Sequence, residues 1–115
     1  MKLNKIIVPD LVFIPSATDM HQDHEVIHAE ALRAFKNTSL LGYDLPCNQT
    51  QFNSNLFIKL SVENINLKAK ALKAYESQSH RNYMQNDFII SLARVRGVQC
   101  NAEYAEAFEV YRLIS

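Results

Sequence analysis

Cysteine is scarce in this 115-residue sequence, and its scarcity argues against two kinds of protein. The two cysteines, Cys47 and Cys100, lie far apart and form no C-x-x-C pair. Disulfide scaffolds and cysteine-rich zinc sites both need several cysteines at close spacing. We therefore expect neither, and we expect a reducing, cytoplasmic environment.

Long apolar runs and blocks of like charge are also missing. No stretch approaches the roughly 20 apolar residues that span a membrane, and the first residues lack the cleavage site of a signal peptide. The 12 basic and 12 acidic side chains cancel, so no charged surface favours nucleic acid or an anionic membrane as a partner. Hydrophobic residues at 48% and charged residues at 21% are typical of a globular protein. The length predicts a single domain over residues 1–115.

The apolar pattern predicts an α/β fold. Short apolar runs predict strands at residues 11–14, 40–45, 56–60 and 104–113, and helical spacing predicts helices after residues 22 and 61 and over residues 82–96. In the first helix, Ile27, Ala31 and Phe35 should share the buried face. Ser61 should cap the second helix, and Gly97 should end the third. The first strand has the continuous apolar character of a buried strand in a parallel sheet.

Ionisable residues gather just after the first predicted strand, where two short motifs share His24. One is H-x-D-H, formed by His21, Asp23 and His24, and the other is H-E-x-x-H, formed by His24, Glu25 and His28. Ligands of open α/β sheets bind beyond the carboxyl ends of the strands, so chemistry is expected in this loop.

The two motifs predict different sites. In a metallopeptidase, His24 and His28 would bind zinc and Glu25 would be the general base, although such motifs usually lie inside an established helix. In the other interpretation, His24 binds a metal at the sheet edge, and Asp23 orients His21 and supports its positive charge. A third interpretation is a non-catalytic α/β module, in which these residues only cap the helix or occupy the loop.

A longer set of segments favours the H-x-D-H interpretation. A strand ending in Pro15-Ser16 precedes a D-x-H-x-D-H loop at residues 19–24. Matching segments follow in order at residues 30–36, 41–43, 70–72, 75–78, 93–97 and 104–109. Together they resemble the PIG-L/LmbE-like family of zinc-dependent N-deacetylases. The resemblance implies a partial Rossmann-like sheet with flanking helices.

The same resemblance implies roles for the loop residues. His24 corresponds to the family's third zinc ligand, His21 to the histidine that stabilises the tetrahedral intermediate, and Asp23 to its partner. The family hydrolyses an N-acetyl group, usually on an amino sugar, with a zinc-bound water that an aspartate deprotonates. That aspartate and the other two zinc ligands belong to an N-terminal P-H-x-D-D-E motif, which is missing from the 115 residues.

Because a catalytic zinc needs about three protein ligands, His24 without that motif should hold zinc weakly or not at all. We therefore expect an N-terminally truncated fragment that is inactive alone. Its partners would be an N-acetylated amino sugar and either the missing N-terminal segment or, through an exposed sheet edge, a second copy of the chain.

Overall fold

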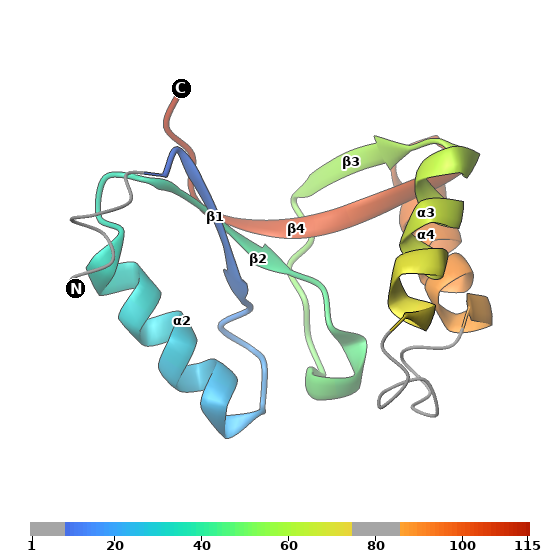
Figure 1. Ribbon diagram of the computed structural model, residues 1–115. Helices are drawn as coiled ribbons and strands as arrows, with labels where there is room; N and C mark the ends of the chain where they lie inside the picture. Colours follow the sequence, from blue (N-terminus) through green and yellow to red (C-terminus); the bar gives the residue numbers. More distant parts are fainter. Residues whose placement is uncertain (1–8, 75–85) are drawn as a thin grey trace. The chain divides into compact units, whose positions relative to one another are not determined.

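The computed structural model describes residues 9–74 and 86–115 (Figure 1). Its elements, in chain order, are β1 (Leu11–Pro15), α2 (Gln22–Ala34), β2 (Ser39–Tyr43), the 3-10 helix η1 (Pro46–Asn48), β3 (Leu56–Leu60), α3 (Val62–Lys73), α4 (Asn86–Gln99) and β4 (Tyr104–Arg112). The predicted α/β class is confirmed. Residues 75–78, which formed part of the family resemblance, lie outside the described residues. Within the described ranges, no helix combines the length and apolar character needed to cross a membrane.

The four strands form one mixed sheet in the order β1-β2-β4-β3. β1 and β2 pair in parallel, with Leu11 opposite Ser39 and Pro15 opposite Tyr43. β4 is antiparallel to β2, which is common in α/β folds whose other strands are parallel. β1 is an edge strand, since among the described strands only β2 pairs with it.

The chain divides into two compact units, each of which is described by itself. The first unit comprises Met1–Leu56 and Phe108–Ser115, and the second comprises Phe57–Ala107. β4 begins in the second unit and continues into the first. The expectation of a single domain over residues 1–115 stays a prediction.

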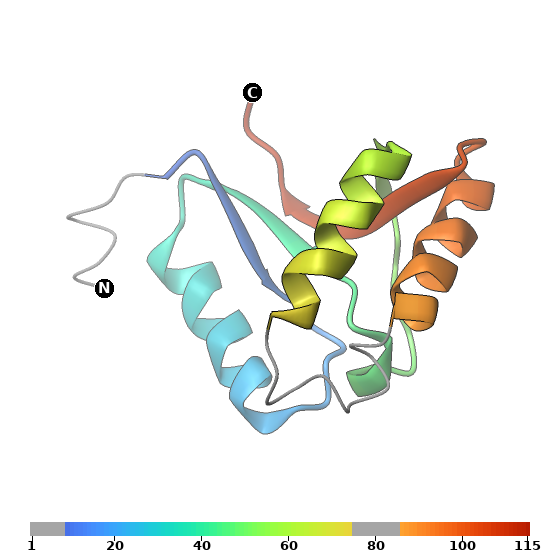
Figure 2. The same ribbon diagram turned by 45° about the vertical axis from the view of Figure 1, so that its right-hand side comes forward.

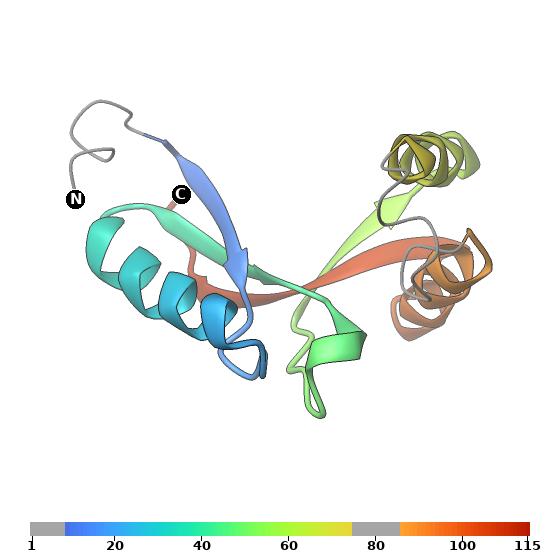
Figure 3. The same ribbon diagram turned by 60° about the horizontal axis from the view of Figure 1, so that its bottom comes forward.

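In the first unit, α2 packs against β1 over a small apolar core (Figure 3). The buried core residues are Ile14, Ala31 and Leu40, with Val12, Phe35 and Tyr111 packed against them. β1 enters this core through Val12 and Ile14, because alternate side chains of a strand point to the same face. The same strand therefore delivers the following loop to the edge of the sheet.

The buried face of α2 agrees with the prediction at Ala31 and fails at Ile27. Ile27 is 50% exposed, whereas Ala31 and Ala34 are buried. The adjacent His28 faces the strand instead, with its Nδ1 at 2.8 Å from the carbonyl oxygen of Pro15. The polar side chain of His28 therefore contacts the end of β1, where the apolar spacing predicted Ile27.

In the second unit, α3 and α4 pack against each other (Figure 2). The predicted cap at Ser61 is confirmed: its hydroxyl accepts the backbone N–H of Asn64, and the Asn64 side chain accepts the backbone N–H of Ser61. This reciprocal capping box satisfies donors that the first turn of a helix leaves free.

The prediction that Gly97 ends α4 is wrong. The helix continues to Gln99, and the residue with left-handed backbone geometry is Asn101, at φ 58°. The chain then turns back so closely that a Cβ on Gly97 would lie 2.5 Å from the carbonyl oxygen of Glu103. Glycine is needed here for close backbone approach rather than for a positive φ.

Candidate functional site

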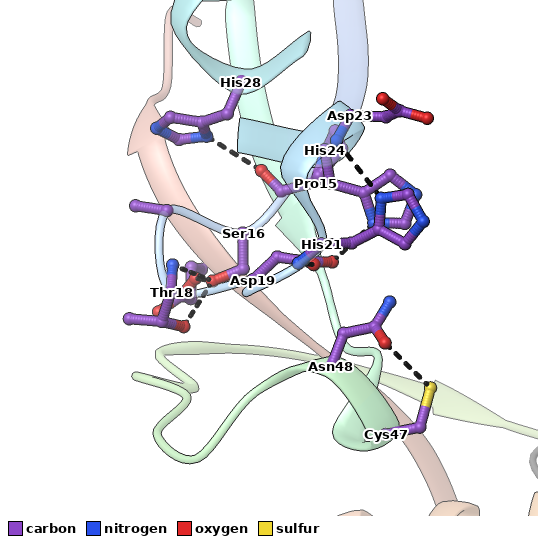
Figure 4. Close-up of polar contacts among 12 residues, drawn as sticks. Pro15, Ser16, Thr18, Asp19, His21, Asp23, His24, His28, Cys47 and Asn48 are labelled. Carbon is purple, nitrogen blue, oxygen red and sulfur yellow. Dashed lines mark hydrogen bonds and ion pairs between the residues drawn. The ribbon is translucent and has the colours of Figure 1, made fainter. Parts of the chain in front are cut away.

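The candidate site is the loop that leaves the carboxyl end of β1 and enters α2 (Figure 4). Neighbouring segments of the first unit hold this loop by its backbone and by its threonine. The Met20 N–H donates to the carbonyl of Asn48 at 2.7 Å, and the Thr18 hydroxyl donates to the carbonyl of Gln51 at 2.6 Å. The segment around η1 therefore supports the loop.

A buried carboxylate on β4 also anchors the loop. Glu109 is 4% exposed and accepts hydrogen bonds from the hydroxyls of Ser16 and Tyr111 and from the Asn53 N–H, the last two at 2.6 Å and 2.9 Å. Tyr111 in turn accepts the Ala17 N–H at 2.8 Å. Burial and, next, the hydrogen bond to Glu109 raise the pKa of Tyr111 above its ordinary value. Sequence reasoning assigned no function to these groups, because they meet only in the folded sheet.

Asp19 is the carboxylate at the centre of the site, and its side chain is 1% exposed. One oxygen accepts the backbone N–H of His21 at 2.8 Å. The other lies 2.8 Å from Nδ1 of His24. Opposite an ionised carboxylate, which only accepts hydrogen bonds, a neutral His24 ring carries its proton on Nδ1 and keeps a lone pair on Nε2. Burial and, secondarily, the charge of Asp19 raise the pKa of Tyr43 at the end of β2.

No role was predicted for Asp19, although it is the first residue of the D-x-H-x-D-H pattern. Its position five residues before His24 was the available signal. That spacing alone does not predict a contact, because the two side chains meet only when the intervening residues form a loop and then the first turn of a helix. Carboxylates behind the ring of a metal-binding histidine are a regular feature of metal sites.

His21 is the N-cap of α2, and its contact favours the opposite tautomer to the one that an ionised Asp19 favours in His24. Its Nδ1 accepts the backbone N–H of Asp23 at 3.2 Å, so the neutral ring carries its proton on Nε2. The rings of His21 and His24 stack with centroids 4.5 Å apart. The exposed side chain of Asp23 extends away from both rings in Figure 4. The predicted catalytic role of Asp23 therefore stays a prediction, and its backbone is the part that contacts His21.

The structure separates the two histidines of the H-E-x-x-H motif. His28 holds the Pro15 carbonyl and lies edge-on to the ring of Tyr111, with centroids 4.9 Å apart. Its ring points in a different direction from that of His24 (Figure 4). A zinc peptidase needs both rings on one ion, and this geometry does not provide that arrangement.

The loop fits one position of a zinc site rather than a whole site. His24 offers a lone pair on a ring that is 24% exposed and backed by Asp19. Within residues 9–74 and 86–115, however, no three histidine, cysteine, aspartate or glutamate side chains are grouped to hold a metal. Further ligands would have to come from elsewhere.

Comparison with known proteins gives a similarity in structure but none in sequence. No protein-family model matches the sequence, and no curated protein sequence matches it. The chain has the α/β architecture of a mixed sheet with flanking helices, and a similar architecture is found in a solved deacetylase. That structure is the zinc-inhibited form of teicoplanin deacetylase Orf2, with a TM-score of 0.72 and 22% sequence identity over 93% of this chain and 46% of that chain. The similarity shows the fold, and this chain spans about half the length of that protein.

Proposed function

We propose that this chain carries part of the active site of a zinc-dependent N-deacetylase of the PIG-L/LmbE-like kind. The observation that carries the proposal is the pair of stacked imidazoles at the end of β1, in which Nδ1 of His24 faces a carboxylate and Nδ1 of His21 accepts a backbone N–H. In their neutral forms, these contacts would leave His24 a lone pair on Nε2, as a zinc ligand requires, and His21 a proton on Nε2, as an oxyanion stabiliser requires. The fold similarity to a deacetylase and the D-x-H-x-D-H pattern support the same proposal.

Each residue would have a separate task in amide hydrolysis. His24 would hold zinc through Nε2, and bound zinc would supply the Lewis acidity that activates water. His21 would donate its Nε2 proton in a hydrogen bond to the amide oxygen as negative charge develops there. Asp23 would hold His21 in this tautomer through its backbone N–H.

The proposed substrate is an N-acetylated amino sugar or its conjugate, which would be cleaved to acetate and the free amine. The support is the family resemblance together with an accessible site. His21 is exposed and His24 is half-buried, so a hydrophilic sugar could reach both rings from solvent.

The edge of the sheet offers a place for further zinc ligands. Within the described residues β1 pairs only with β2, and its side chains Leu11 and Phe13 are 44% and 55% exposed. A strand added in parallel to β1 would end at the same sheet edge, and its following loop would lie beside His21 and His24. We propose that a segment carrying the P-H-x-D-D-E motif binds there, with self-association of this chain as the alternative.

The test compares the chain alone with the chain co-expressed with an N-terminal segment from a PIG-L/LmbE-like deacetylase. Metal analysis and acetate release from N-acetylglucosamine conjugates are measured for each. We expect weak zinc binding alone, and about one zinc per complex together with deacetylation after complementation. His24→Ala should lose both zinc and activity. His21→Ala should keep zinc and lose roughly 10²- to 10³-fold in kcat.

His28→Ala is the matched control, because it removes an imidazole from the same helix and should leave zinc bound. Tight zinc binding by the chain alone that both His24→Ala and His28→Ala abolish would instead establish the metallopeptidase arrangement. A folded complex without zinc or activity would refute the deacetylase proposal and favour a non-catalytic module.

A further inference from the structure

Asp19 is the most buried carboxylate at the site, and neither histidine motif assigns it a task. We infer that Asp19 is a positioning residue that fixes the tautomer and the orientation of the His24 ring, so that Nε2 is the atom presented to a metal. The metal part of this inference rests on the proposed function. The tautomer part rests only on the geometry of the loop.

The two oxygens of Asp19 serve different parts of the site. Oδ1 holds the backbone of His21 where α2 begins, and Oδ2 holds the ring of His24, both at 2.8 Å. The carboxylate is 1% exposed, so little water competes for its lone pairs, and hydrogen bonds to an ionised group in such surroundings are strong. One side chain therefore sets both the start of the helix and the direction of the ring.

Asp19 is itself held by the loop. Its backbone N–H donates to the Ser16 carbonyl at 3.1 Å, and the next residue, Met20, donates to Asn48 at 2.7 Å. Ser16 is fixed in turn by the buried carboxylate of Glu109. Because these hydrogen bonds fix the loop that carries Asp19, the His24 ring adjusts to Asp19 rather than the reverse.

The chemical consequence concerns the two ring nitrogens of His24. A carboxylate opposite Nδ1 retains the proton there, leaves Nε2 unprotonated and raises its basicity as a ligand. In Asp19→Asn, the amide oxygen can still accept the His21 N–H while the amide nitrogen donates to Nδ1. The ring would then carry its proton on Nε2, and this proton would compete with a metal for that nitrogen, much as the tautomer changes when the aspartate of a serine-protease triad becomes asparagine.

The test is ¹⁵N NMR of the histidine rings in the 115-residue chain at a pH of about 8.5, well above the ordinary histidine pKa of about 6.5. We expect the Nδ1–H tautomer for His24 in the wild type and the Nε2–H tautomer in Asp19→Asn. Asp10→Asn, which removes an exposed carboxylate just before β1, should leave the wild-type tautomer unchanged. A wild-type His24 with its proton on Nε2 would overturn the inference, even if Asp19→Asn did not fold.

Zinc binding by the complemented protein separates this inference from the proposed function. Asp19→Asn should weaken zinc binding about 10- to 100-fold while Asp10→Asn leaves it unchanged. Unchanged zinc affinity in a folded Asp19→Asn complex would refute the positioning role. The expected tautomers together with no zinc in any assembly would refute the proposed function and leave the control of the tautomer by Asp19 standing.

Discussion

Glu109 joins the site loop to β4, so its loss should destabilise the first unit strongly. In Glu109→Ala, three donors lose their acceptor: the hydroxyls of Ser16 and Tyr111 and the N–H of Asn53. Of the three, Ser16 is buried, Tyr111 is half-buried and Asn53 is exposed, and a cost of about 1–3 kcal/mol applies to a buried donor that is left unsatisfied. The three share one acceptor, so their costs are not additive, and removal of the carboxylate also relieves its own desolvation. We therefore expect a loss of about 2–3 kcal/mol, a substantial share of the roughly 5–15 kcal/mol by which such proteins are stable.

The assay is urea unfolding followed by circular dichroism, with Glu106→Ala as the matched control. Glu106 is also a glutamate of β4, but it is 39% exposed and forms a long ion pair with Lys68, at 3.8 Å. Exposed ion pairs of this kind contribute about 0–1 kcal/mol, so the control should remain close to wild type. Glu109→Gln should fall between the two, because its amide oxygen still accepts while its amide nitrogen faces a donor.

A specific result would refute this reasoning. If Glu109→Ala lost less than about 1 kcal/mol with an unchanged dependence on urea, the buried carboxylate would not be holding the loop. Equal losses in Glu109→Ala and Glu106→Ala would contradict it as well, since burial would then make no difference.

Two further predictions concern the helix end and alkaline pH. Gly97→Ala should lower Tm by roughly 5–10 °C, because the new Cβ would lie 2.5 Å from the Glu103 carbonyl oxygen. Ser91→Ala, on the exposed face of the same helix, is the control and should leave Tm unchanged. An unchanged Tm in Gly97→Ala would show that the chain after α4 can move aside. Burial raises the folded-state pKa of Tyr43 and Tyr111, so their contribution to stability is complete below a pH of about 10 and is lost as the pH rises through the raised folded pKa. Urea unfolding should therefore give a lower stability at pH ~10.5 than at pH ~8, with a smaller drop in Tyr111→Phe, and an equal drop in that variant would exclude Tyr111 as a source.

Features that depend on neighbours in the chain could be read from the sequence. The strand at residues 56–60 and its helix cap at Ser61 were predicted correctly, because strand-forming residues and a serine before an apolar helical pattern act locally. The strand before the site was recognisable because prolines bound its apolar run. The loop with His21 and His24 was likewise placed at the carboxyl end of that strand by the order of elements alone.

Features that depend on partners distant in sequence were decided only by the tertiary structure. Ser16 and Glu109 are 93 residues apart, and no local pattern indicates that they share a buried hydrogen bond. Gly97 was assigned to a helix end, but the decisive contact is with backbone that returns after the helix. His28 and Ile27 are adjacent, and which of them faces β1 depends on the Pro15 carbonyl. Apolar periodicity reports the preference of a side chain for burial, whereas the partner of a buried polar group depends on which strands the fold brings together.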